Sequence, residues 1–150
     1  MEEFLSTINT IGFSNKYNKI KINLIDKIYN VTTNGRNSLN IFTDIIFYSE
    51  KGTIFDFQNS DKSHITIEFK PNLTNAKIIF QNITFYNYNY DVLDKYLLFF
   101  DITYDHNDFL IEFDNCTFKN INSCIFSLGY YCMKSLKNSP QIIFNNCKFL

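Results

Sequence analysis

Three aspartates and a histidine lie close together in the segment DITYDHND, at positions 101–108. Asp101, Asp105 and Asp108 offer the oxygen ligands that Ca²⁺ binds, and His106 could act as a general base. The segment lacks the spacing, the glycine and the glutamate of an EF-hand loop, and no partner nucleophile can be identified for His106. We therefore favour a polar loop after a strand and keep the three aspartates as weak calcium candidates.

Outward acidic residues form two further candidate pairs, Asp56 with Glu68 and Glu112 with Asp114. Paired carboxylates are the groups that glycoside hydrolysis uses. Acidic residues on the wet side of strands are also ordinary, and that interpretation is favoured here. The sequence supplies no confident catalytic residue, metal ligand or cofactor-binding residue.

The segment FYNYNYD (85–91) alternates aromatic residues with asparagine and aspartate. A row of Tyr86, Tyr88 and Tyr90 could stack on sugar rings, and the amides between them could bond sugar hydroxyls. The alternative is a polar loop with an aromatic bias, which the composition favours.

All four cysteines, Cys116, Cys124, Cys132 and Cys147, belong to the C-terminal part of the chain. No CxxC pair is present, so a zinc site has weak support. Buried thiols are the favoured interpretation.

Composition and charge narrow the class of protein. The chain has 150 residues, enough for one domain with a sizeable core, and a formal net charge of −1. Arg36 is the only arginine, which argues against nucleic-acid binding. The strongest apolar run, YLLFF at 96–100, is far shorter than the roughly 20 residues of a membrane span. The start, MEEFLSTINT, lacks the basic and apolar parts of a signal peptide.

One helix followed by strands is predicted. Phe4, Leu5, Ile8 and Ile11 fall on one face of a helix that ends near Gly12. The rest of the chain alternates apolar and polar residues and favours extended structure. Strands are expected at 20–31, 39–49, 53–58, 64–70, 77–86, 96–104, 110–118, 123–128 and 141–149.

A pattern I-x-F-x-N-x-x-F recurs three times, at 78–85, 111–118 and 142–149. Its asparagines, Asn82, Asn115 and Asn146, are expected at bends with left-handed backbone and could form an amide ladder. A looser copy at 41–47 has Asp44 in the asparagine slot. The inward positions predict a core ladder of Phe80, Phe113, Phe144, Cys116 and Cys147.

The three copies begin at residues 78, 111 and 142, and repeats at this spacing favour stacked coils. Neighbouring strands of such coils lie about 4.8 Å apart. Cys116 would then lie over Cys147, where a disulfide is geometrically possible and a packed thiol row is preferred. The alternative is a β-sandwich whose Ile, Phe and Asn usage coincides by composition. We expect an all-β fold, a right-handed parallel β-helix with a short N-terminal capping helix. Residues 1–19 would form the cap and linker, and residues 20–150 the coils.

The I-x-F-x-N copies resemble the repeats of pectin-lyase-like right-handed β-helices. More narrowly, they are similar to the Asn- and Phe-rich repeat proteins of social amoebae, which are related to polymorphic outer-membrane repeats. The resemblance covers residues 20–150, and for full-length relatives it implies a cell-surface or extracellular location. The Gly-Gly-Ala-Ile strand of those repeats is absent, however. Arg36 is remote from any acidic strand cluster, and the Gly-His-Gly and Arg-Ile-Lys motifs of polygalacturonases are missing. Inherited catalysis therefore does not follow.

The copy at 141–150 stops directly after its second strand, so we expect an incomplete last coil or end-to-end self-association. The function expected is a non-enzymatic β-helix module for binding or structure, with a polysaccharide or glycoprotein as partner. The alternatives are a polysaccharide lyase or glycoside hydrolase relic with little activity, and an intracellular scaffold.

Overall fold

A computed structural model describes residues 2–13, 18–31, 37–60, 62–70, 76–89, 96–102, 109–130 and 141–150. These residues form one helix and twelve strands. The elements are α1 (Glu2–Phe13), β1 (Lys19–Asn23), β2 (Ile28–Asn30), β3 (Ser38–Ile41), β4 (Asp44–Asp56), β5 (Ile65–Phe69), β6 (Ala76–Tyr88), β7 (Tyr96–Ile102), β8 (Phe109–Asp114), β9 (Thr117–Ile121), β10 (Cys124–Tyr130), β11 (Ile142–Asn145) and β12 (Lys148–Phe149). The expected mostly-β fold with one short N-terminal helix is confirmed.

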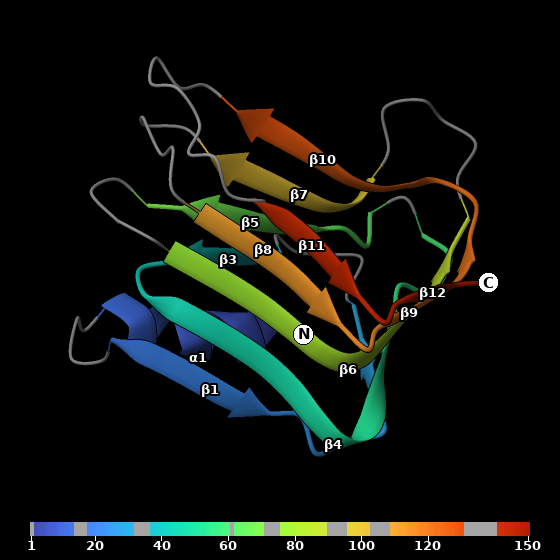
Figure 1. Ribbon diagram of the computed structural model, residues 1–150, viewed down its shortest axis with the longest axis horizontal. Helices are drawn as coiled ribbons and strands as arrows, with labels where there is room; N and C mark the ends of the chain where they lie inside the picture. Colours follow the sequence, from blue (N-terminus) through green and yellow to red (C-terminus); the bar gives the residue numbers. More distant parts are fainter. Residues whose placement is uncertain are drawn as a thin grey trace.

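The strands form two sheets, and every strand pair described in them is parallel (Figure 1). One sheet has the order β1-β4-β6-β8-β11, with β2, β9 and β12 continuing the same rows beyond a corner. The other has the order β10-β7-β5-β3. Along the chain, the rows β1–β2, β4, β6, β8–β9 and β11–β12 of the first sheet alternate with the strands β3, β5, β7 and β10 of the second.

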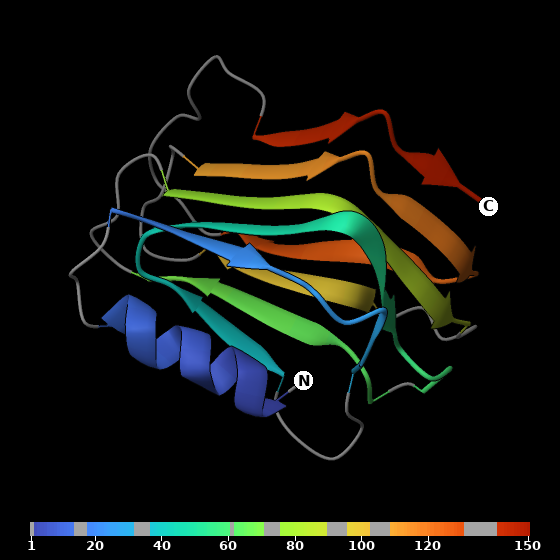
Figure 2. The same ribbon diagram turned by 90° about the horizontal axis from the view of Figure 1, so that it is seen from below.

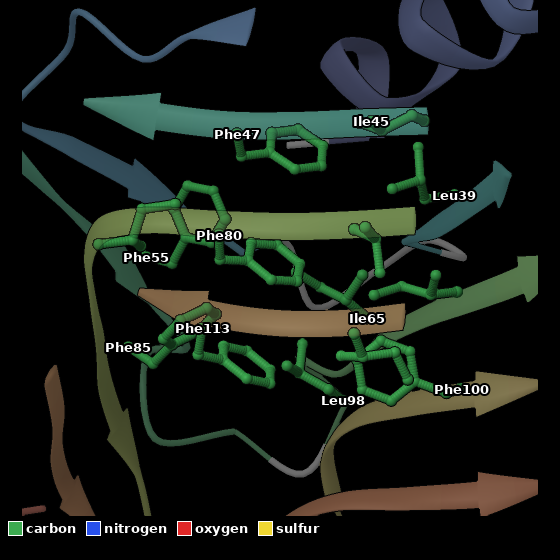
Figure 3. Packing of buried hydrophobic residues seen from close by; sticks show 14 of the residues in the cluster. Leu39, Ile45, Phe47, Phe55, Ile65, Phe80, Phe85, Leu98, Phe100 and Phe113 are labelled. Carbon is green, nitrogen blue, oxygen red and sulfur yellow. The ribbon is translucent and has the colours of Figure 1, made fainter. Parts of the chain in front are cut away.

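Inward side chains of the two sheets make one apolar core, which includes Phe47, Phe80 and Phe113 (Figure 3). The strand register pairs Phe47 with Phe80 and Phe80 with Phe113. Because parallel in-register strands place like residues side by side, three phenylalanine rings stack. The ring centroids are 5.5 Å and 5.3 Å apart, and the rings are within about 11° of parallel.

The helix α1 packs on β3, the last strand of its sheet, and lies at the opposite end of the molecule from β11 and β12 (Figure 2). Leu5 and Ile8 are buried in the core, as the helical pattern predicts, whereas Ile11 is 41% exposed. The side-chain amide of Asn9 donates to the Ser38 carbonyl at 3.0 Å and accepts from the Asn40 N–H at 2.7 Å. Asn9 thereby supplies the two hydrogen bonds that a neighbouring strand would give to β3. Within the described residues, no helix is long and apolar enough to cross a membrane.

The Asn9 amide predicts a measurable contribution to stability. We expect Asn9→Ala to lower the free energy of unfolding by about 1–3 kcal/mol, because it leaves two part-buried backbone groups of β3 without their hydrogen-bond partner. These groups are the Ser38 carbonyl and the Asn40 N–H. Thr10→Ala is the matched control. It removes an exposed bond from the Thr10 hydroxyl to the Ser6 carbonyl, and should change stability by less than about 0.5 kcal/mol. Urea denaturation of both variants tests this, and equal losses would contradict it.

The segment 39–49, predicted as one strand, is divided between the two sheets. β3 ends at Ile41 and β4 begins at Asp44, so the chain turns a corner at Phe42 and Thr43. The looser repeat at 41–47 is therefore wrong. The true register aligns Ile45 with Ile78 and Phe47 with Phe80.

Residues 49–52 occupy the place in β4 that Asn82 alone occupies in β6. In this insertion Gly52 takes a left-handed backbone, with φ of 83°. A glycine adopts this conformation without strain.

Candidate functional site

Asparagines form a row at the corner of the first sheet, where β8 is followed by β9 and β11 is followed by β12. Asn82, Asn115 and Asn146 have φ of 57°, 52° and 51°, the left-handed backbone that their repeat positions predict. The Asn115 amide donates to the Asn82 side-chain oxygen at 3.4 Å, and the Asn82 amide donates to the Ser49 carbonyl at 2.7 Å. The row therefore binds successive strands together at the corner.

A second asparagine row, which was not predicted, lies near the ends of β6 and β9. Asn87 and Asn120 have φ of 68° and 55°, and the Asn120 amide donates to the Asn87 side-chain oxygen at 3.1 Å. The Asn87 amide reaches the Asp56 carboxylate at 3.5 Å. The signal was present in the sequence, because an asparagine follows two residues after both Phe85 and Phe118.

The predicted core ladder is buried except in its last copy. Phe80 and Phe113 are at most 2% exposed and Cys116 is 1% exposed, whereas Phe144 is 37% exposed and Cys147 is half-buried. Phe144 still stacks on Phe113, with centroids 4.9 Å apart. The difference arises because no described strand lies beyond β11 and β12.

Cys116 and Cys147 occupy equivalent positions and are both free thiols. The Cys116 thiol donates to the Phe80 carbonyl and the Cys147 thiol to the Phe113 carbonyl, each at 3.3 Å. Burial raises the pKa of the Cys116 thiol to about 12, and a weaker effect of burial also raises the pKa of Cys147. This arrangement is that of a packed thiol row and does not favour a reactive nucleophile.

We expect Cys116 to resist alkylation. With Cys124 and Cys132 replaced by serine, iodoacetamide at neutral pH should modify Cys116 at least about a hundredfold more slowly than a free cysteine, because the thiolate is the reacting form. Because the raised pKa favours the protonated thiol in the folded state, stability should be full below the unfolded-state pKa of about 8.5 and fall as the pH rises toward 12. Peptide mapping by mass spectrometry measures the labelling. Rapid labelling of Cys116 in the folded chain would contradict the prediction.

The tyrosine row predicted at 86, 88 and 90 is wrong at its centre. Tyr88 is fully buried and packs edge-on against Phe57, with ring centroids 5.9 Å apart. The left-handed corner at Asn87 shifts the alternation by one residue, so Tyr88 points inward like Phe85. Tyr90 lies outside the described residues.

Of the two described tyrosines in this segment, Tyr86 is the one on the water-facing side. It is half-buried, and its neighbours in the register are Asp56 on β4 and Lys119 on β9. The residues beside these three, Phe55, Phe85 and Phe118, are buried on the opposite side of the sheet. A carboxylate and an ammonium group thus flank an aromatic ring in one row across three strands. We call Asp56, Tyr86 and Lys119 the Tyr86 row.

The first predicted carboxylate pair, Asp56 with Glu68, is not formed. Asp56 and Glu68 belong to different sheets, so they do not form a pair. Asp56 accepts from the Gln58 N–H at 2.8 Å, and Glu68 forms an ion pair with Lys70.

Glu112 and Asp114 do share β8 and its water-facing side. Each nevertheless accepts from an amide on a neighbouring strand: Glu112 from Asn145 at 2.8 Å and Asp114 from Gln81 at 3.3 Å. These carboxylates serve as links between strands, a role different from that of an acid and base pair.

The calcium candidates are only partly within the described structure. Asp101 lies on β7, half-buried, with Glu68 opposite it on β5. Asp105, His106 and Asp108 lie outside the described residues, as do Arg36 and Cys132. In the part of the chain that is described, no three histidine, cysteine or acidic side chains gather closely enough to hold a metal ion.

Comparison of the chain with known protein families, with curated proteins and with solved structures finds no match.

Proposed function

We propose that residues 20–150 form the coils of a right-handed parallel β-helix, in which each coil adds one strand to each sheet. Three observations support this. The chain alternates between the two sheets and advances by one strand at each crossing. Like residues align in register from strand to strand, and asparagine rows run through two corners. The Asn9 amide of α1 would then cap the first coil.

We further propose that this module is non-enzymatic and binds glycans through its water-facing side. The Tyr86 row is the observation that carries the proposal. A half-buried tyrosine ring offers a flat apolar platform for the C–H face of a sugar. Asp56 and Lys119, each about 4.8 Å away on the adjacent strands, can bond the hydroxyls around that ring.

A glycan-array screen followed by titration of the best-bound sugar tests the proposal. We expect Tyr86→Ala to weaken binding by at least about tenfold, because the stacking platform is lost, and Tyr86→Phe to retain it. Tyr48→Ala is the matched control, since Tyr48 is also half-buried and water-facing but its ring is already covered by the Lys21 ammonium, 4.3 Å from the ring centroid. Equal effects of the Tyr86 and Tyr48 changes, or no bound glycan, would refute this site.

A polysaccharide lyase or hydrolase relic is the competing assignment. A polygalacturonate cleavage assay separates the two, because a binding module leaves the polymer intact. Cleavage that disappears on replacing Asp105 or Asp108 by asparagine would overturn the non-enzymatic proposal.

A further inference from the structure

The strands β11 and β12 lie at the end of the molecule opposite α1 (Figure 2). Apolar side chains on the last described strands are exposed there. Leu128 on β10, Phe144 on β11, Phe149 on β12 and the adjoining Leu150 are 38%, 37%, 57% and 72% exposed. These residues lie on or next to the last described strands of the two sheets. The rings of Phe126 on β10 and Phe144 on β11 connect the two sheets there, with centroids 6.2 Å apart. We call these four residues the β11 edge surface.

The structure contains the same surface one strand earlier, where it is covered. Phe113 and Phe118 hold the positions of Phe144 and Phe149, and they are 0% and 2% exposed. Phe144 and Phe149 cover them as parallel rings, with centroids 4.9 Å and 5.2 Å apart and planes within 10°. The segment that fits on an I-x-F-x-N-x-x-F copy is therefore another copy of the same pattern.

The backbone at this edge has the conformation needed to accept such a copy. Asn115, one strand earlier, donates its N–H to the Asn145 carbonyl at 2.8 Å, and Asn120 donates to the Leu150 carbonyl at 2.9 Å. Asn146 has the φ of Asn115, 51° against 52°, so its corner repeats the same geometry. The backbone N–H groups of Ile111 and Asn115 donate to the next strand, β11, or to the residue before it. Because a parallel ladder repeats from strand to strand, the N–H groups of the equivalent residues Ile142 and Asn146 point away from β8.

A second copy of this chain is a poor occupant. To continue the ladder, it would have to present its β1 and β2 end, where Phe4 of α1 packs against Tyr29 and Phe47 with ring centroids 5.7 Å and 6.2 Å apart. The helix thus covers the core at the end that would have to dock.

We propose that the β11 edge surface is a docking site for a β-strand pair of the pattern I-x-F-x-N-x-x-F, supplied by a partner polypeptide. The partner adds in parallel and in register. Its two phenylalanines cover Phe144 and Phe149, and its main chain bonds the edge of β11 and β12 beyond which no described strand lies. The proposal is separate from glycan binding, because the Tyr86 row lies on the water-facing side of the sheet and the β11 edge surface lies at its end.

Fluorescence anisotropy with a labelled peptide tests the docking site. The probe is the sequence of residues 141–150, QIIFNNCKFL, with serine in place of its cysteine and a lysine-linked fluorophore, titrated with the full chain. We expect saturable binding, and at least about tenfold weaker binding to the Phe149→Asp chain, because a charge then faces the incoming ring. A scrambled peptide of the same composition should not bind.

Ile25→Asp is the matched chain variant, since Ile25 is 83% exposed and precedes β2, remote from β11. It should bind the probe as the unchanged chain does. Absence of binding, or equal weakening by Phe149→Asp and Ile25→Asp, would overturn the proposal. So would light scattering that shows a dimer abolished by Phe149→Asp, because the occupant would then be a second copy. Circular dichroism verifies that both variants fold.

Discussion

Replacement of Phe113 by alanine is expected to lower the free energy of unfolding by about 3–5 kcal/mol, the largest effect of any single change considered for this chain. Phe113 is fully buried, and its ring stacks between Phe80 and Phe144. It also meets Phe85 and Phe118 edge-on, with centroids 5.9 Å and 5.5 Å away. Removing it leaves a cavity among four rings that the strand register prevents from closing. Urea denaturation followed by circular dichroism measures the loss.

Phe144→Ala provides the comparison within the same row. Phe144 is 37% exposed and has no described ring beyond it, so less apolar area is lost and no closed cavity forms. We expect a cost of about 1–2 kcal/mol. Equal costs at the two positions would mean that stacking along the row contributes little and that local packing within each strand dominates.

The sequence was sufficient to predict the parts of the fold that depend on local alternation. Ile-x-Phe at period two places Ile78 and Phe80 inward, and the same holds for Ile111 and Phe113. Leu5 and Ile8 face the core from a helix at the predicted place. These features follow from local periodicity, because side-chain direction in a strand or helix is fixed by the backbone repeat alone.

The bends at Asn82, Asn115 and Asn146 were predicted from the repeat, whereas two other corners, at Asn87 and at Phe42, were not. FYNYNYD has strict alternation, yet the left-handed Asn87 turns the chain and sends Tyr88 to the core. Likewise, Phe42 and Thr43 carry the chain from one sheet to the other within a segment predicted as one strand, although the polar pair Thr43 and Asp44 lies at this corner.

The candidate ligand site was predicted only in part for the same reason. Tyr86 was identified, but its neighbours Asp56 and Lys119 are placed beside it by the register between distant segments. Pairing of this kind depends on which strands become neighbours, and periodicity within one segment does not specify that.

Asn82 is the position where corner chemistry should be most costly to change. Its amide donates to the Ser49 carbonyl at 2.7 Å, its oxygen accepts from Asn115 at 3.4 Å, and its φ is 57°. Alanine removes both bonds and must adopt a left-handed backbone that costs about 1–2 kcal/mol by itself. With the unpaired Ser49 carbonyl added, we expect Asn82→Ala to lower the free energy of unfolding by about 2–4 kcal/mol.

Two further variants separate the backbone contribution from the hydrogen bonds. Asn82→Gly keeps the left-handed corner free of strain but loses the amide, so it should be about 1 kcal/mol more stable than Asn82→Ala. Asn146→Ala incurs the same left-handed strain at an exposed corner, with φ of 51°, and should cost only about 1–2 kcal/mol. Urea denaturation ranks the three. If glycine were as harmful as alanine at Asn82, the amide row alone would hold this corner; if Asn146→Ala matched Asn82→Ala, the amide row would contribute nothing and backbone conformation would be the whole effect.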